Sequence, residues 1–310
     1  SKEYHIIKIE ENAFKYSSNP KVITFSCTSD LKFISKNAFT HSGVQKIILP
    51  KKIQNLEEGW CKSTNCLYYL IAPINNKHIT YVNDSLLICN DLKKYKKNDE
   101  ENDDDFYDDE NTLIFARRDI EITTIPSYVK RIGESAFENC EKLRSVTFEN
   151  LTFSEKEPDT SNSSSLLEEI GNNAFAYCKN LEKISFIPRN IKRIGQMSFA
   201  YCSKLSTLEM SRDCQLRIIS RDAFFHSSLK ELFIPSSLEY FEEGWCRDTN
   251  DLTNIKLSPT NEHFKYIDDQ LLMTKYEHNS KECFILNFAR RDIESVVIPS
   301  NVKKIASCAF

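Results

Sequence analysis

The residues of this chain that could do chemistry recur in matched pairs. His41 is matched by His226, and the Arg-Arg-Asp sequence at 117–119 is matched by the same sequence at 290–292. A histidine can exchange protons near neutral pH, and paired arginines can bind an acidic partner. For the histidines we favour a hydrogen bond that repeats in a turn. For the arginines we favour a local pair with the aspartate, in a motif that caps the return of the chain to its core.

The sequence patterns of phosphate-binding loops, dinucleotide-binding loops, serine hydrolases and zinc proteases do not occur. Six glycines among 310 residues leave few for loops that cradle phosphate. Cys61 and Cys66 could hold zinc, but Cys246 and Asp251 stand at the matching positions of the second copy. The acidic run at 99–110 lacks the ordered spacing of a calcium loop. We therefore expect no catalytic residue, no cofactor and no metal site.

The cysteines follow a pattern that predicts packing rather than disulfide bonding. The number of cysteines is eleven, so at least one cannot form a disulfide within the chain. Cys140, Cys178 and Cys202 each follow a phenylalanine by three positions, and Cys61 matches Cys246. One cysteine in the same phase of each repeat predicts a stacked column of small buried side chains. We expect mostly free thiols, which suit either side of a cell membrane.

A long segment of the chain is written twice. Residues 31–88 align with residues 216–273 without a gap at an offset of 185, and Trp60 falls on Trp245. The likeness resumes at an offset of 173, so the first copy carries an insertion of 12 residues. Repeats of this kind indicate a solenoid, in which each unit buries its apolar edge against its neighbours. We expect both tryptophans to lie in the core.

A shorter unit lies inside the long one and is clearest at 166–210. Its phenylalanines recur every 24 or 25 residues, within the range of leucine-rich repeats. In one unit we expect Leu181, Ile184 and Phe186 to point inward from a strand while alternate residues face out. We expect Ala174-Phe175 to form a short helical turn against the core. The phenylalanines that mark the units are Phe14, Phe39, Phe137, Phe175, Phe199, Phe224 and Phe310.

Two segments interrupt this rhythm in the same way. Residues 263–273 and 283–288 predict a strand, an Asp-Asp turn, a strand, a loop and a further strand. The first copy has the same pattern at 79–88 and 112–115, so we expect a hairpin excursion in each copy.

The unit Gly-x-x-Ala-Phe-x-x-Cys-x-x-Leu-x-x-Ile-x-Ile-Pro, strongest at 132–140 and 170–178, resembles the BspA-like, treponemal-type leucine-rich repeat. The long module looks like the BspA-like surface protein families of parasitic protists. The resemblance implies a curved right-handed solenoid and, often, a cell-surface protein that adheres to host cells, matrix proteins or other microbes. The chain departs from the family at the two hairpins, at the acidic insertion, and where Gly-Trp replaces Ala-Phe at 59–60 and 244–245.

The expected architecture is a single leucine-rich-repeat solenoid, rich in short strands with brief helical turns. It begins and stops inside repeats, so we expect a piece of a longer protein. The internal divisions that we expect are long modules at 31–148 and 216–310, regular short repeats at 166–215, and mobile loops at 91–111 and 155–165.

The best candidate for function is the outward face of the strands. Exposed aromatic and apolar side chains on such a face suit a protein contact, although loops or hairpins could instead cover them. The candidate protein-binding residues are Tyr68, Tyr69, Ile71, Lys183, Ser185, Thr207, Glu209, Glu231, Phe233, Asn254 and Lys256. Lys46 and Ile48 belong to the same outward rows.

The totals restrict the partner class. A net charge of −4 and a pI of about 6.0 give no support to nucleic-acid binding. No run approaches the roughly 18 apolar residues of a transmembrane helix, so we expect no direct insertion into a membrane. Together with the family resemblance, which implies adhesion at a cell surface, these observations lead us to expect a non-enzymatic adhesion module at the cell surface, with a protein partner. The alternative is an intracellular structural scaffold.

Overall fold

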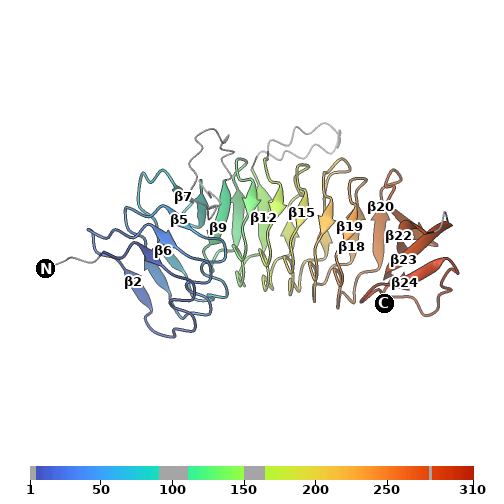
Figure 1. The fold of residues 1–310 in the computed structure, drawn as a ribbon, viewed down its shortest axis with the longest axis horizontal. Helices are drawn as coiled ribbons and strands as arrows, with labels where there is room; N and C mark the ends of the chain where they lie inside the picture. Colours follow the sequence, from blue (N-terminus) through green and yellow to red (C-terminus); the bar gives the residue numbers. More distant parts are fainter. Residues whose placement is uncertain (1–4, 91–110, 150–164, 279–280) are drawn as a thin grey trace.

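The structure is a computed structural model that describes residues 5–90, 111–149, 165–278 and 281–310. The loops predicted to be mobile, 91–111 and 155–165, lie outside the described residues except at their last positions. The chain forms an elongated stack of short strands with its two ends far apart (Figure 1). This confirms the predicted leucine-rich-repeat solenoid.

Most turns of the solenoid contribute one strand to each of two rows. The first row consists of β1 (Lys8–Ile9), β3 (Phe33–Ile34), β5 (Asn55–Leu56), β11 (Arg131–Ile132), β13 (Glu169–Ile170), β15 (Arg193–Ile194), β17 (Ile218–Ile219) and β19 (Tyr240–Phe241). The second row consists of β2 (Val22–Thr24), β4 (Lys46–Ile48), β6 (Tyr69–Ile71), β10 (Ile122–Ile125), β12 (Ser145–Phe148), β14 (Lys183–Ile184), β16 (Thr207–Leu208), β18 (Glu231–Ile234) and β20 (Asn254–Leu257). Neighbouring strands of a row pair in parallel within each sheet. The first row is divided between the sheet β1-β3-β5 and the sheet that contains β11, β13, β15, β17 and β19, and the second row is divided into the sheets β2-β4-β6, β10-β12-β14 and β16-β18-β20.

The connection from the first row to the second contains two residues in the left-handed conformation, four positions apart. In one turn these are Asn173 and Tyr177, with φ of 55° and 62°. The N–H groups of Asn173, Phe175 and Tyr177 donate to backbone oxygens of the next turn, each over 2.8 Å. A helix needs these donors for its own ladder and cannot pass through left-handed residues. The expected helical turn is therefore a non-helical turn, and the described residues contain no helix.

Phenylalanines stacked along the axis fill the centre of the solenoid. Phe137, Phe175, Phe199 and Phe224 are fully buried, and successive ring centroids lie 4.7, 5.4 and 5.7 Å apart. Beside them runs the predicted cysteine column: the Cys178 thiol donates to the carbonyl oxygen of Phe137 over 3.1 Å. Each unit therefore completes the core of its neighbour, as the repeat pattern predicts.

The inward assignment of Phe186 is wrong. Leu181, Ile184 and Ile187 are buried, whereas Phe186 is only half-buried and lies on the outward side. The strand β14 ends at Ile184, and the backbone turns before Pro188, so strict alternation does not extend to Phe186.

Both predicted hairpins are confirmed. β7 (Ile79–Val82), β8 (Leu86–Cys89) and β9 (Thr112–Ala116) pair antiparallel, as do β21 (Phe264–Ile267), β22 (Leu271–His278) and β23 (Lys281–Ala289). The last strand of each set then pairs in parallel with the next strand, β9 with β11 and β23 with β24 (Val302–Ile305). At the first tip Asn83 and Asp84 both have φ near 50°, as the tight two-residue hairpin turn requires.

The hairpins do not project from the solenoid but lie within it as partitions. Leu87 and Cys89 pack into the core of the preceding turns, whereas Leu86 and Ile88 pack into the core of the following turns. In the second copy, Leu272 faces back and Leu271 faces forward in the same way. A strand with two buried faces has a nearly continuous apolar sequence, which explains Leu-Leu-Ile-Cys in β8.

The Gly-Trp pairs do not replace Ala-Phe, because the structure shifts them by one position. Gly59 has the left-handed φ of 73° that Asn37 has at 60°, and the N–H of Phe39 donates to the oxygen of Trp60. Trp60 therefore occupies the alanine position, and Cys61 occupies the phenylalanine position. The buried indole packs edge-on against Phe39, with ring centroids 5.7 Å apart. Regular turns have a small residue at this position. The larger tryptophan prevents the next turn from stacking directly on this one.

At this turn a buried arginine adds side-chain hydrogen bonds to those of the backbone. Arg118 is 2% exposed and follows the hairpin strand β9. Its guanidinium donates to the carbonyl oxygens of Ala136 (2.8 Å), Ser135 (3.4 Å) and Thr64 (3.4 Å), and lies 5.0 Å from the ring centre of Phe115. The arginine thus joins the turn before the hairpin to the turn after it.

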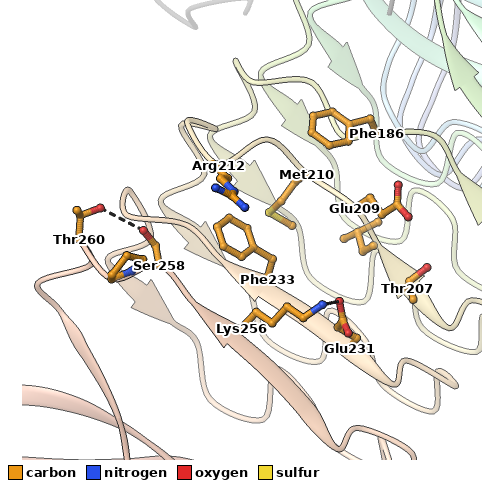
Figure 2. A pocket seen from close by; sticks show the side chains of 12 residues that line it. Phe186, Thr207, Glu209, Met210, Arg212, Glu231, Phe233, Lys256, Ser258 and Thr260 are labelled. Carbon is orange, nitrogen blue, oxygen red and sulfur yellow. Dashed lines mark hydrogen bonds and ion pairs between the residues drawn. The ribbon is translucent and has the colours of Figure 1, made fainter. Parts of the chain in front are cut away.

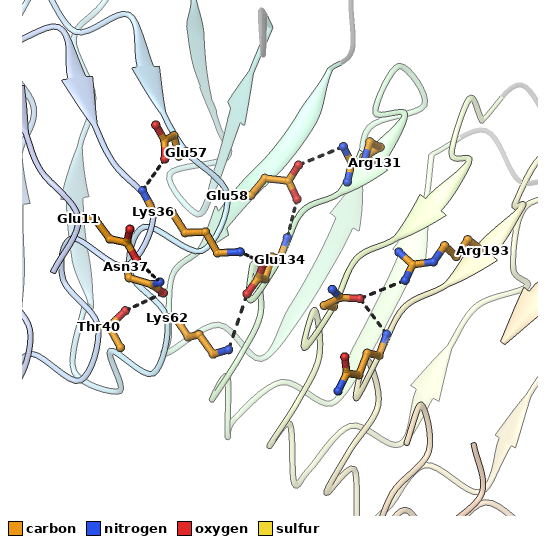
Figure 3. A network of polar contacts seen from close by, with 12 residues as sticks. Glu11, Lys36, Asn37, Thr40, Glu57, Glu58, Lys62, Arg131, Glu134 and Arg193 are labelled. Atoms are coloured by element: carbon orange, nitrogen blue, oxygen red, sulfur yellow. Dashed lines mark hydrogen bonds and ion pairs between the residues drawn. The ribbon is translucent and has the colours of Figure 1, made fainter. Parts of the chain in front are cut away.

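A buried carboxylate makes a second link across the same interruption. Glu138 is 3% exposed and accepts hydrogen bonds from the backbone N–H (2.8 Å) and the hydroxyl (3.0 Å) of Ser63. Figure 3 shows a further link near the surface, where Lys36 pairs with Glu134 (2.7 Å) and the Glu134 N–H donates to Glu58 (2.9 Å).

The second copy repeats the arginine link. The Arg291 guanidinium donates to the carbonyl oxygens of Ala309 and Cys308, both at 2.9 Å, and lies 5.0 Å from the ring centre of Phe288. The second arginine of each Arg-Arg-Asp motif therefore has a structural role.

The Phe175→Ala substitution should lower the free energy of unfolding by about 3–5 kcal/mol, because it opens a cavity in the phenylalanine stack. Tyr177→Ala, in the same turn but partly exposed, should cost less, about 1–2 kcal/mol. Urea denaturation followed by circular dichroism measures both. A loss below about 1 kcal/mol for Phe175→Ala would show that this ring does not hold the core.

The Arg118→Gln substitution should lower the free energy of unfolding by about 2–5 kcal/mol, because it leaves buried carbonyl oxygens without charged donors. Its neighbour supplies the matched control: Arg117→Gln removes a partly exposed ion pair and should cost less than about 1 kcal/mol. Urea denaturation of the two variants compares these costs, and equal losses would contradict the bridging role of Arg118.

Candidate functional site

The second row of strands carries the candidate binding residues on its outward side. Thr207 lies beside Glu231 and Glu231 beside Asn254, while Phe233 lies beside Lys256. In the first sheet, Tyr69 lies beside Lys46 in the same way. The structure does not bring all the candidates together, since the hairpin and the division into three sheets separate them into three sectors.

The apolar sector consists of Tyr68, Tyr69 and Ile71 at the end of the first sheet. These side chains are 37%, 61% and 47% exposed, so neither the hairpin nor any loop that the structure describes covers them. The matching residues of the second copy are Thr253, Asn254 and Lys256. The fold therefore does not require apolar residues at these positions. Burial, with a smaller contribution from Cys66, raises the pKa of Tyr68.

The hydroxyl sector covers the middle sheet. The hydroxyls of Thr124 and Thr147 are 2.8 Å apart, and the Ser185 hydroxyl accepts the N–H of Phe148 over 3.3 Å. Lys183 is exposed beside them. These polar groups satisfy one another or face water, as on an ordinary solvated sheet.

The third sector is hollowed into a groove of about 700 Å³ over β16, β18 and β20. Half-buried Phe186 and Phe233, with buried Met210, give the groove an apolar floor, as Figure 2 shows. Five of the candidate residues line it, namely Thr207, Glu209, Glu231, Phe233 and Lys256. Most of the other lining residues lie at strand ends, where alternation fails, so the sequence pattern does not predict them. They are Phe186, Leu208, Met210, Arg212, Ser258, Pro259 and Thr260.

Charges in the groove fall into a paired set and an unpaired set. Glu231 accepts from Lys256 over 2.5 Å and from the side-chain amide of Asn254 over 2.7 Å, which fixes one wall. Glu209 and Arg212 form no ion pair with any residue that the structure describes, and both are exposed. The groove therefore combines a rigid wall, an apolar floor and two charges of opposite sign that are available to a ligand.

The repeated histidines stand at a corner where the hydrogen bond between turns comes from the backbone and does not depend on the histidine side chain. The backbone N–H of His41 donates to Lys62 (3.1 Å), and that of His226 donates to Arg247 (3.3 Å). The His226 ring also stacks on Tyr201 with centroids 5.2 Å apart. The hydrogen bond that repeats is thus a backbone bond between turns.

The first arginine of each Arg-Arg-Asp motif pairs locally, as expected. Arg117 donates two hydrogen bonds to Asp119 (2.7 and 3.2 Å), and Arg290 donates two to Asp292 (2.9 and 2.6 Å). The hydrogen bond from Arg290 lowers the pKa of Asp292. These motifs are therefore engaged within the fold.

All eleven cysteines are free thiols, and only Cys27 is exposed. Burial raises the pKa of Cys61 and of Cys89 to about 12, from an ordinary value of 9.0. Because these thiols hold their protons more tightly in the folded state, they contribute to the free energy of unfolding. This contribution is fully present below about pH 9 and is lost as the pH rises toward 12. No group of three or more His, Cys, Asp or Glu side chains within the described residues could hold a metal ion. Nor does any helix long and apolar enough to span a membrane occur in the part of the chain that the structure describes.

Comparisons with known proteins agree with this architecture. A family model described as the BspA type leucine rich repeat region matches residues 2–102, 111–157 and 150–274, in six copies. No curated protein matches the sequence.

Among solved structures, the pneumococcal vaccine antigen PcpA is 20% identical with a TM-score of 0.54, over 83% of this chain and 49% of that one. A leucine-rich cell surface protein of Faecalibacterium prausnitzii is 18% identical with a TM-score of 0.45, over 75% of this chain and 67% of that one. A leucine-rich repeat protein of Bacteroides ovatus is 22% identical with a TM-score of 0.42, over 57% and 41%. The chain thus spans about half the length of the first of these structures. At these identities the likeness concerns the fold alone.

The thiols should divide sharply in reactivity. With DTNB at pH 8, native protein should release one equivalent rapidly from exposed Cys27, and half-buried Cys66 and Cys308 should react more slowly. The eight buried thiols should react only in denaturant. Rapid release of many equivalents from the native protein would contradict the buried cysteine column.

Proposed function

Because the chain belongs to the BspA-type leucine-rich repeat proteins, we propose that it is a non-enzymatic protein-binding module that acts in adhesion at a cell surface. It binds through the outward face of its second row of strands, at the groove over β16, β18 and β20. The observation that carries this proposal is that predicted outward residues line a groove with an apolar floor.

The composition of the groove supports a protein partner. Protein interfaces place aromatic side chains and methionine in a water-excluded centre and polar groups around it. Phe186, Met210 and Phe233 would form such a centre, and Thr207 and Thr260 would belong to the polar surround.

The rigidity of the site also supports binding. Side chains that are ordered before a partner arrives lose less conformational entropy on association. The bonds that join Glu231 to Lys256 and Asn254 hold one wall in place, and the three strands beneath it are paired in parallel.

The groove offers little for catalysis, which is why we propose a binding module rather than an enzyme. A nucleophile needs an adjacent base, and a general base must reach the proton that it abstracts. The only side-chain hydrogen bond of Ser258 that involves a groove residue is with Thr260, at 3.1 Å, and Glu231 is engaged by Lys256 and Asn254.

Adhesion should depend on the apolar floor. Beads coated with the whole chain should adhere to cultured cells or to immobilised extracellular-matrix proteins. Phe233→Ser should reduce adhesion at least about tenfold, since central aromatic residues carry most of the binding energy of an interface. Lys192→Ala, an exposed position beside β15 in the first row of strands, is the matched control and should leave adhesion unchanged. Counting bound beads under flow measures this.

Failure of every surface to retain the wild-type beads would contradict an adhesive role, and so would full retention of the Phe233→Ser beads. Location is tested on source cells with an antibody to this chain. Staining of intact cells that protease removes is the expected result. Staining only after permeabilisation would instead favour an internal scaffold.

A further inference from the structure

The groove has two charges that form no ion pair with any residue in the described part of the chain. Glu209 directly follows β16, and Arg212 lies three residues further on. The carboxylate nearest to Arg212 in sequence is Asp213, which pairs instead with Arg189 over 3.3 Å. Both side chains are exposed at the groove, so their charges cost little in the free protein and can be neutralised by a ligand.

The two charges lie on either side of Met210. In Figure 2, Glu209 lies toward Thr207, whereas Arg212 lies on the other side of Met210, next to the Phe233 ring. Opposite charges across an apolar centre do not suit a polyanion such as a nucleic acid, because Glu209 and Glu231 would repel it. They suit a ligand that itself carries both signs around an apolar group.

From this arrangement we infer that the groove takes an extended protein segment in which one apolar side chain lies between a basic and an acidic side chain. The apolar side chain packs on Phe233 and Met210, the basic side chain meets Glu209, and the acidic side chain meets Arg212. The inference rests on the proposed protein-binding function and specifies the partner's chemistry.

The spacing follows from extended geometry. Alternate residues of an extended chain point to the same side, and each residue advances the chain by about 3.3 Å. Charged residues two positions before and two after the apolar residue therefore lie about 13 Å apart. Glu209 and Arg212 are three residues apart, about 10 Å if the chain is extended, and their long side chains can cover the difference. A groove of about 700 Å³ has room for such side chains.

Five-residue motifs within biotinylated synthetic peptides test the inference, with display on tetrameric streptavidin to increase avidity. The first peptide carries Lys-Ser-Leu-Ser-Glu, the second Glu-Ser-Leu-Ser-Lys, the third has serine in place of leucine, and the fourth has serine in place of both charges. We expect one of the two charge orders to bind at least tenfold more tightly than the other three peptides.

The decisive variant reverses both charges, Glu209→Lys with Arg212→Glu, and should transfer the preference to the opposite order. Both residues are exposed and lack described ion pairs, so the variant should keep the wild-type melting temperature. The control reverses the exposed pair of Glu182 and Lys204, which form an ion pair over 3.4 Å, and should keep the wild-type preference.

An unchanged preference in the double reversal would overturn the inference, as would equal binding of the uncharged peptide. Bead adhesion distinguishes a failure of the charge pattern from a failure of the proposed protein-binding function. Adhesion that depends on Phe233 without any peptide preference would refute the charge pattern alone. If the wild-type chain showed neither adhesion nor peptide binding, the proposed function would be refuted as well.

Discussion

The structure depends on hydrogen bonds between successive turns at the left-handed corner. Each regular corner offers three N–H donors, such as those of Asn173, Phe175 and Tyr177, and the next turn supplies their acceptors. Buried backbone groups without partners are costly, so a turn that cannot stack must be satisfied in another way. At the hairpins the guanidinium of buried Arg118 and that of half-buried Arg291 reach carbonyl oxygens across the interruption. The solenoid continues past each hairpin because these side chains add to backbone hydrogen bonds such as the one from the Ala116 N–H to the Ala136 oxygen, at 2.8 Å.

The interruption of the stack also shapes the surface that is left for binding. The first hairpin has both faces buried and divides the core, so it separates the sheet β2-β4-β6 from the later strands of the second row. A second break, between β14 and β16, lies among regular turns, and the two breaks divide the outward face into an apolar, a hydroxyl and a hollowed sector. Only the last combines depth, a fixed polar wall and unpaired charge. The repeated turns form the scaffold, and the groove forms where the turns depart from the regular pattern.

Much of this architecture could be predicted from the sequence. The repeat period predicts the solenoid, the paired Asn-Asp and Asp-Asp turns predict the hairpins, and strand alternation places Thr207 and Glu231 on the outward face. Prediction failed where local geometry departs from regular periodicity. Phe186 lies past the end of β14, where alternation no longer applies, and Trp60 occupies a position that sequence alignment assigns to phenylalanine. Arg118 could not be recognised as buried from the sequence, because an arginine next to an Arg-Asp pair is normally a surface charge. The carbonyl oxygens that accept its hydrogen bonds belong to other turns, and only the structure brings them close.

The central claim is that the Arg118 side chain holds together the turns on either side of the first hairpin. Amide hydrogen exchange of the wild-type chain and of Arg118→Gln tests it most directly, because exchange reports local opening segment by segment. The account predicts that the variant loses protection at 57–64 and 112–138, while 205–210 and 229–234 exchange as in the wild type. Unchanged protection at 57–64, or an equal loss along the whole chain, would contradict it.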